Sequence, residues 1–486
     1  MSISFNTIPV GIRVPGQYIE FDNSRALQGL PVERQKILVM GQRQAGGSVA
    51  AGVPTRVMSA GQAEDAFGRG SMLGAMLRAL KGANAYTECW AVALDDNGAG
   101  AAAAGTLTLG GAPTEAGTLN LYVGGQLVQV AVASGATLAA LATALAGAVA
   151  ADTTLPVSAA AAGAVLTLTA NHKGEAANGL DLRLNYYPGE RTPKGLTVTI
   201  AAMSGGTANP DVQVAITAIG DEQYHTVIAP YTDGANLGKI EALLAARWGG
   251  MVMKEGQAFA AVAGPLTAAT TLGHGRNSPH VCLMGAGKSP TPAWVWAAVV
   301  GAVDAFEPDP NRPRQTLPLP GLLAPAIADR WSWAERNVAL FDGVATHTVD
   351  AGGTVLIERL VTTYKTNAYG VLDPSYLDVE QMRLLAYLRF STRAMVSQKY
   401  PRHKLGDDGV QYAQDQLVMT PGLMVAELVG LFVAWMGAGL VEDLPQFKRD
   451  LVVRRNAGDA SRLDAVIPPN CINQFRVFAA QIQFRL

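Results

Sequence analysis

The stretch Lys36-Ile37-Leu38-Val39-Met40-Gly41 is continuously apolar after its first residue, which predicts a β-strand buried on both faces. Similar apolar runs recur at 88–94, 226–230, 258–262 and 281–284. Helical patterns lie between them at 71–83, 236–248 and 292–306. Because continuous apolar strands that alternate with helices are typical of a sheet covered on both faces, the fold class is predicted to be α/β.

The middle of the chain, residues 98–207, differs in composition from the rest. Up to Asn171, its only charged residues are Glu115 and Asp152. Strand patterns dominate, and Gly124-Gly125 between two of them signals a two-residue hairpin. Since surface loops tolerate insertions, we interpret this segment as a β-rich domain inserted into a loop of the α/β sheet.

The last residues alternate strictly between apolar and polar or small side chains. Phe478, Ile482, Phe484 and Leu486 share one face, and Gln481 lies on the other. Chain ends usually fray unless they are tied down. We therefore expect this terminal strand to pair with a sheet, either its own or a neighbour's.

The first residues predict a second extended arm. Val10, Ile12 and Val14 alternate with glycine, arginine and proline. Pro9 and Pro15 exclude a helix here, and proline is compatible with an edge strand.

These patterns divide the chain into a multidomain α/β core with an inserted β-rich domain and terminal extended arms. A helix capped by Asp378 and another over 421–439 belong to the last globular part, whereas 308–345 is proline-rich and is expected to be irregular. The predicted parts are an N-terminal arm (1–25), an α/β core (26–97 and 208–345), an inserted outer domain (98–207), a C-terminal α/β inner domain (346–474) and a C-terminal arm (475–486).

Charge is scarce in this chain. Charged residues make up 16% of the 486 positions, below the roughly 25% that is usual in soluble domains. This composition suits a protein that buries much of its outside against other subunits. The net charge of −2 gives no field that attracts nucleic acid. No secretory signal is visible at the start, so a cytoplasmic origin is expected.

One segment has nearly the length and composition of a membrane span. Residues 423–441 are apolar except for Glu427, close to the roughly 20 residues that a bilayer crossing needs. Thr420-Pro421 is a good helix start, and no basic cluster flanks the N-terminal end. We favour a helix buried in protein over membrane insertion.

Sites for catalysis, cofactors or metals do not emerge from the motifs. Lys288 follows a glycine-rich stretch, but a phosphate loop requires glycine where Cys282 stands. His274 and His280 form the closest histidine pair, and we favour plain loop histidines over a metal site. Three scattered cysteines indicate neither a disulfide framework nor zinc. An α/β enzyme of unknown substrate remains the alternative reading, because fold alone does not fix function.

A basic run without intervening acids is the remaining charged feature. It could contact an acidic partner or be a solvated helix face, and both alternatives stay open. Its members are Arg389, Arg393, Lys399, Arg402 and Lys404.

Several stretches together resemble the tail sheath proteins of contractile-tailed bacteriophages, particularly the Mu-like group. The resemblance covers both ends and the α/β core but not the insert at 98–207. It is carried by residues 15–26 (PGQYIEFDNSRA), 359–367 (RLVTTYKTN), 372–378 (LDPSYLD) and 473–486 (NQFRVFAAQIQFRL).

This resemblance implies a structural protein without cofactors. Subunits would stack as six-membered rings around a tail tube, and the sheath would contract to drive the tube through the host envelope. The implied partners are other copies of the chain, the tube protein, and the baseplate and tail terminator proteins. The implied location is the virion, after assembly in the host cytoplasm.

The resemblance also implies roles for particular residues. Both arms would pair with sheets of neighbouring subunits, and a helix near the C-terminus would face the tube. The implied arm residues are Val10, Ile12, Val14, Tyr18, Phe478, Ile482, Phe484 and Leu486. The implied tube-facing residues are Met424, Glu427, Leu428 and Leu431, with the basic run as the alternative surface.

Overall fold

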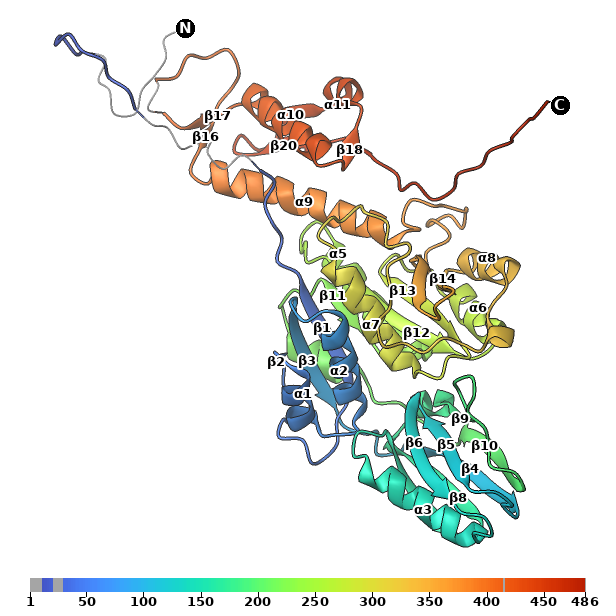
Figure 1. Cartoon of the computed structure of the whole chain (residues 1–486). Helices are drawn as coiled ribbons and strands as arrows, with labels where there is room; N and C mark the ends of the chain where they lie inside the picture. The colour runs from blue at the N-terminus through green and yellow to red at the C-terminus, as the bar shows by residue number, and fades with distance from the viewer. Residues whose placement is uncertain (1–10, 21–28, 414–415, 486) are drawn as a thin grey trace. The chain divides into compact units, whose positions relative to one another are not determined.

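The computed structural model describes residues 11–20, 29–413 and 416–485, so Val10 and Leu486 lie outside the described residues. The chain forms two compact units. Unit 1 comprises 1–33 and 387–474, and unit 2 comprises 34–386 and 475–486. Both contain helices and strands, which confirms the predicted multidomain α/β class (Figure 1). The domain boundaries expected from the sequence stay predictions.

An eight-stranded sheet is the centre of unit 2, in the order β15-β14-β13-β12-β11-β1-β3-β2 (Figure 1). The inner six strands run parallel, and the edge strands β2 and β15 are antiparallel to their neighbours. The bounds are β1 (Lys36–Gln42), β2 (Thr55–Val57), β3 (Glu88–Leu94), β11 (Thr226–Ile228), β12 (Gln257–Ala263), β13 (Val281–Gly287), β14 (Val344–Val349) and β15 (Val355–Arg359). All five predicted strands are present, because burial on both faces leaves a continuous apolar run.

Helices cover this sheet. They are α1 (Ala60–Phe67), α2 (Met72–Ala83), α4 (Gln213–Ile219), α5 (Gly234–Trp248), α6 (Leu266–His274), α7 (Ala293–Phe306) and α8 (Trp333–Phe341), with short 3₁₀ turns η1 (Glu175–Gly179) and η2 (Ile327–Asp329). Helix α7 packs on α2 and on the strands β11 and β12. Gly301 permits this close approach, since a Cβ there would lie 2.9 Å from Cγ1 of Ile228.

The segment 308–345 is less irregular than expected. Helix α8 lies within it and begins with a capping box. The Ser332 side chain accepts from the backbone of Glu335, whose carboxylate accepts from the backbone N–H of Ser332. This Ser-x-x-Glu spacing was a readable start signal, and the proline-rich stretch that precedes it obscured it.

The insert contains two antiparallel sheets and one helix. One sheet has the order β10-β4-β8-β7 and the other β6-β5-β9. The bounds are β4 (Ala102–Gly111), β5 (Gly117–Val123), β6 (Gln126–Val132), α3 (Leu138–Ala151), β7 (Val157–Ala162), β8 (Val165–Lys173), β9 (Leu182–Leu184) and β10 (Leu196–Ser204). The predicted hairpin is confirmed, because Val123 pairs with Gln126 and the two glycines between them have φ of 55° and 79°.

Unit 1 is built around the C-terminal helices. Its elements are the later part of α9 (Val379–Lys399), α10 (Pro421–Gly437), α11 (Leu444–Asp450) and the strand pairs β16 (Lys404–Leu405) with β17 (Val418–Met419), β18 (Val441–Glu442) with β21 (Asn470–Cys471), and β19 (Val452–Arg455) with β20 (Leu463–Val466). Phe432 and Phe447 stack with ring centroids 4.1 Å apart. Buried Trp435 donates from Nε1 to Oγ of Ser391 over 2.9 Å, which fixes α10 on α9. No helix in the described part of the chain is long and apolar enough to cross a membrane.

Candidate assembly surfaces

The C-terminal arm presents its apolar side chains to solvent. Residues 475–485 contain no strand or helix. Phe478, Ile482 and Phe484 are 79%, 88% and 79% exposed. A strand needs a partner for its backbone hydrogen bonds, and the arm has none within the described chain. The sequence pattern for a strand is thus present without the strand itself.

The N-terminal arm behaves in the same way where it is described. Residues 11–20 form no strand, and Ile12, Val14 and Tyr18 are exposed. The Tyr18 hydroxyl donates to the carbonyl of Val14 over 3.1 Å. Exposed large apolar side chains on an extended segment are typical of a segment that is covered in an assembly.

One residue of the C-terminal arm is partly buried, in contrast to its exposed neighbours. The Arg476 side chain is 13% exposed. Its Nη2 lies 3.3 Å from Oδ1 of Asp378 and 3.0 Å from Oε2 of Glu380. Asp378 also receives two hydrogen bonds from the guanidinium of Arg359, at 2.8 and 3.0 Å. Nothing in the sequence points to Arg476, because a lone arginine in a strand pattern carries no signal of an ion pair.

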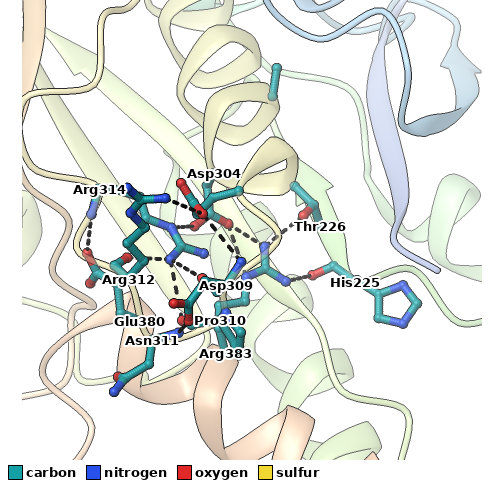
Figure 2. A network of polar contacts seen from close by, with 12 residues as sticks. His225, Thr226, Asp304, Asp309, Pro310, Asn311, Arg312, Arg314, Glu380 and Arg383 are labelled. Atoms are coloured by element: carbon teal, nitrogen blue, oxygen red, sulfur yellow. Dashed lines mark hydrogen bonds and ion pairs between the residues drawn. The ribbon is translucent and has the colours of Figure 1, made fainter. Parts of the chain in front are cut away.

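Glu380 lies next to a second ion-pair cluster, which is centred on the fully buried Asp304 (Figure 2). Asp304 of α7 accepts from Nε of Arg314 and from Nε of Arg383, both at 3.0 Å. Burial alone would raise the pKa of Asp304, but the Arg383 and Arg314 guanidinium groups hold it below its usual range. The backbone N–H of Arg314 donates to Oε1 of Glu380 over 2.9 Å, which connects the two clusters.

The hairpin of β19 and β20 has two open edges. Its strands pair with each other from Val452 with Val466 to Arg455 with Leu463. Among the described residues neither strand has a second partner strand. A two-stranded hairpin is marginally stable on its own in water. The hairpin is therefore an incomplete sheet. It lies within residues 346–474, the predicted C-terminal inner domain.

Helix α10 buries most of the side chains that were expected to face a tube. Met424, Leu428 and Leu431 are buried in unit 1, so they do not form an exposed surface. Glu427 pairs with Lys399, with Oε2 and Nζ 2.6 Å apart. Although burial would raise it, the pKa of Glu427 is lowered by this ion pair. The helix is apolar all round, so its sequence did not show which side is covered.

The opposite side of α10 is exposed and carries no charge. Its members recur at helical spacing and are small or apolar. They are Leu423, Ala426, Gly430, Val433 and Gly437.

The basic run is partly engaged within unit 1. Besides the ion pair of Lys399, the ammonium of Lys404 donates to Oε1 of Gln416 over 2.7 Å. The run therefore does not present all its charges to a partner.

The motifs considered for chemistry have structural partners. Lys288 pairs with Asp329 at 2.7 Å, and His274 lies 3.3 Å from Asp342. Burial lowers the pKa of His280 to about 4, so this histidine is neutral. No cluster of metal-ligating side chains occurs among the described residues.

Comparison with known families gives two matches. Residues 205–363 match the phage tail sheath protein central domain, and residues 372–485 match the phage tail sheath C-terminal domain. These ranges include the eight-stranded sheet from β11 onward, the helices of unit 1 and the C-terminal arm.

Individual relatives agree with these matches. The chain is 43% identical over 488 residues to a Mu-like prophage tail sheath protein of Haemophilus influenzae, with 100% of both chains covered. A solved sheath tail protein of Listeria innocua is 12% identical and has a TM-score of 0.50, with 92% of this chain and 94% of that one covered, which supports the fold. A sheath tail protein of Desulfitobacterium hafniense is 14% identical with a TM-score of 0.49, over 94% and 100% of the two chains. This chain therefore belongs to the phage tail sheath protein family, in its Mu-like group, and is a structural protein of a contractile tail rather than an enzyme.

Proposed function

We propose that this protein polymerises as stacked six-membered rings around a tail tube, and that each arm completes a sheet in a neighbouring subunit. Contraction of this lattice drives the tube through the host envelope. The partners are further copies of the chain, the tube protein, and the baseplate and tail terminator proteins. Assembly takes place in the host cytoplasm, and the protein becomes part of the virion without binding nucleic acid or inserting into a membrane.

The observation that carries the proposal is that the hairpin has unpaired strand edges while the arms have the sequence pattern of strands. The β19–β20 hairpin offers two unpaired edges, and neither terminal arm forms a strand where the structure describes it, at 11–20 and 475–485. Adding a donated strand at each edge gives a four-stranded sheet through backbone hydrogen bonds. Burial of each large apolar side chain of the donated strand stabilises the contact by roughly 1.5–3 kcal/mol.

The large sheet of unit 2 is a poorer acceptor. The outer edge of β15 is already occupied, because the backbone N–H of Leu319 donates to Val355 and that of Ile357 donates to Leu317, both over 2.9 Å. The other edge strand, β2, spans only three residues. A donated strand of the length of the C-terminal arm therefore finds more free backbone at the hairpin.

The exposed side of α10 is the surface that we assign to the tube. It is apolar and lies opposite the side that packs against α9 and α11. This assignment keeps the helix that the sequence pointed to but replaces Met424, Leu428 and Leu431 with Leu423, Ala426 and Val433. An uncharged face suits a contact that must slide or release during contraction, since no ion pair has to be broken.

Removal of residues 477–486 tests the proposal. The truncated chain keeps Arg476 and all regular elements, so it should be folded and monomeric by circular dichroism and analytical ultracentrifugation. Negative-stain electron microscopy should then show cylinders for the full chain and none for the truncated chain. The matched control is Gln481→Ala, which leaves the apolar face and the backbone intact and should assemble normally. Cylinders of normal length from the truncated chain would refute strand donation by this arm.

A further inference from the structure

We infer that Arg476 anchors the C-terminal arm: it holds the origin of the arm on unit 2 while residues 477–486 are donated. Arg476 is in this sense a positioning residue, and the inference rests on the proposed function. The anchor sets the point from which the donated strand departs. It also transmits force from the neighbouring subunit to unit 2.

Burial separates the anchor from the donated segment. Phe475 and Val477 on either side of Arg476 are 77% and 80% exposed, whereas the Arg476 side chain is 13% exposed. The backbone there is extended and makes no ladder. The side chain of Arg476 is therefore what holds this part of the arm, at 3.0 Å from Glu380 and 3.3 Å from Asp378.

Charge balance explains why the anchor stays in place when the arm moves. Glu380 is fully buried, and among the described residues Arg476 is the cation within ion-pair distance of its carboxylate. Asp378, in contrast, has a second cation in Arg359. Departure of Arg476 would leave a buried carboxylate without a cation, which is strongly unfavourable. The arm is thus expected to bend after residue 476 and not before it.

The anchor has a direct connection to the central sheet. Asp378 and Glu380 lie at the start of α9, and Arg359 ends β15. One turn further along α9, Arg383 pairs with Asp304 of α7 (Figure 2). Tension on the arm therefore passes through side-chain ion pairs into a helix and a strand of unit 2.

The test combines a variant that removes the anchor with one that removes the buried charge. Arg476→Ala alone leaves Glu380 uncompensated and should lower the thermal midpoint of the monomer. Arg476→Ala with Glu380→Gln removes both charges, and its thermal midpoint should return close to that of the parent. The control is Arg485→Ala, which changes an exposed arginine of the same arm. Each protein is assembled, sheared by repeated passage through a fine needle, and counted as intact cylinders by electron microscopy.

The double variant should give at least tenfold fewer intact cylinders after shear than the parent or Arg485→Ala, although its monomer is equally stable. Cylinders from the double variant with parental number and length after shear would overturn the anchor. If the double variant behaves like the parent while the chain without 477–486 fails to assemble, the anchor is wrong and strand donation stands. If the chain without 477–486 assembles normally, strand donation fails and the anchor fails with it.

Discussion

Arg383 of α9 donates from Nε to Oδ2 of Asp304 of α7 over 3.0 Å, and the acceptor carboxylate is completely buried. The same guanidinium donates from Nη1 to the carbonyl of His225 over 2.6 Å, just before β11. A single side chain thereby joins the start of α9, helix α7 and the central sheet. Because Arg314 supplies a second cation, Asp304 remains ionised in spite of its burial.

We expect Asp304→Asn to be among the most destabilising single changes in the chain. It leaves two buried guanidinium groups without their carboxylate, which should lower the free energy of unfolding by roughly 3–5 kcal/mol. Urea unfolding followed by circular dichroism measures this. Asp329→Asn breaks the more exposed pair with Lys288 and should cost below about 1 kcal/mol. Equal effects from the two changes would contradict this account of the cluster.

Acid should weaken the folded state through two histidines whose pKa is lowered in the folded chain. Burial lowers the pKa of both His280 and His347 to about 4, below the ordinary value of 6.5. The unfolded chain then binds more protons between these values, so the free energy of unfolding falls as the pH drops from 6.5 toward 4. The expected loss between pH 7.5 and pH 5 is about 2 kcal/mol per histidine.

Urea unfolding at these two pH values tests the histidine prediction. His280→Gln and His347→Gln should each remove part of the pH dependence. The parent chain, measured in parallel, supplies the reference slope. A slope that survives both substitutions would assign the acid sensitivity to other groups.

The two sides of α10 should respond differently to a charge. Val433→Asp places the carboxylate on the exposed side, so the monomer should stay folded while assembly on purified tubes decreases severalfold. Leu431→Asp places it on the buried side and should unfold unit 1. Co-sedimentation with tubes, with circular dichroism of each monomer, separates the two effects. Normal tube binding by Val433→Asp would move the tube contact away from this helix face.

Strand donation predicts a sharp contrast between two neighbouring positions of the C-terminal arm. Ile482→Pro removes a backbone donor and a large apolar side chain, and it should abolish cylinders without changing the monomer. Gln481→Ala keeps the backbone donor and should be tolerated. Electron microscopy at matched concentrations gives the answer, and assembly by Ile482→Pro would show that the arm is not held as a strand.

Deletion of 98–206 should leave assembly intact, because the two ends of the insert meet. Ala101 and Thr207 exchange backbone hydrogen bonds of 3.1 and 3.3 Å, and Asn97 reaches the carbonyl of Asn209. The deletion does remove the hydrogen bond from the backbone N–H of Met72 to His172, so a modest loss of stability is expected. A folded deletion protein that forms no cylinders would place the insert in the lattice, with the open edges of its sheets as the acceptors.

Strands and helices were predictable wherever burial leaves a repetitive pattern. The runs that became β1, β3 and β13 are apolar on both faces, and the turn at Gly124-Gly125 needs two positive φ angles, so both features appear directly in the sequence. Helix α8 was obscured by neighbouring prolines, although its capping box was present.

The assembly surfaces were only half predictable. Alternation in the C-terminal arm indicates a strand, but the open hairpin edge that could receive it depends on the pairing of short segments. The buried face of α10 could not be chosen from a helix that is apolar all round. The ion pair between Arg476 and Glu380 joins distant parts of the chain. A single charged residue has no sequence pattern that identifies such a partner.

A β-bridge between Ala101 and Thr207 holds the two ends of the segment 98–207 side by side. The β-rich segment 98–207 begins and ends there, between β3 and β11 of the large sheet. Any other domain whose own termini lie one bridge apart could be exchanged at the same position. The segment 98–207 is in this respect the part of the subunit that we expect to tolerate exchange, since its replacement requires no change in the strands of the large sheet.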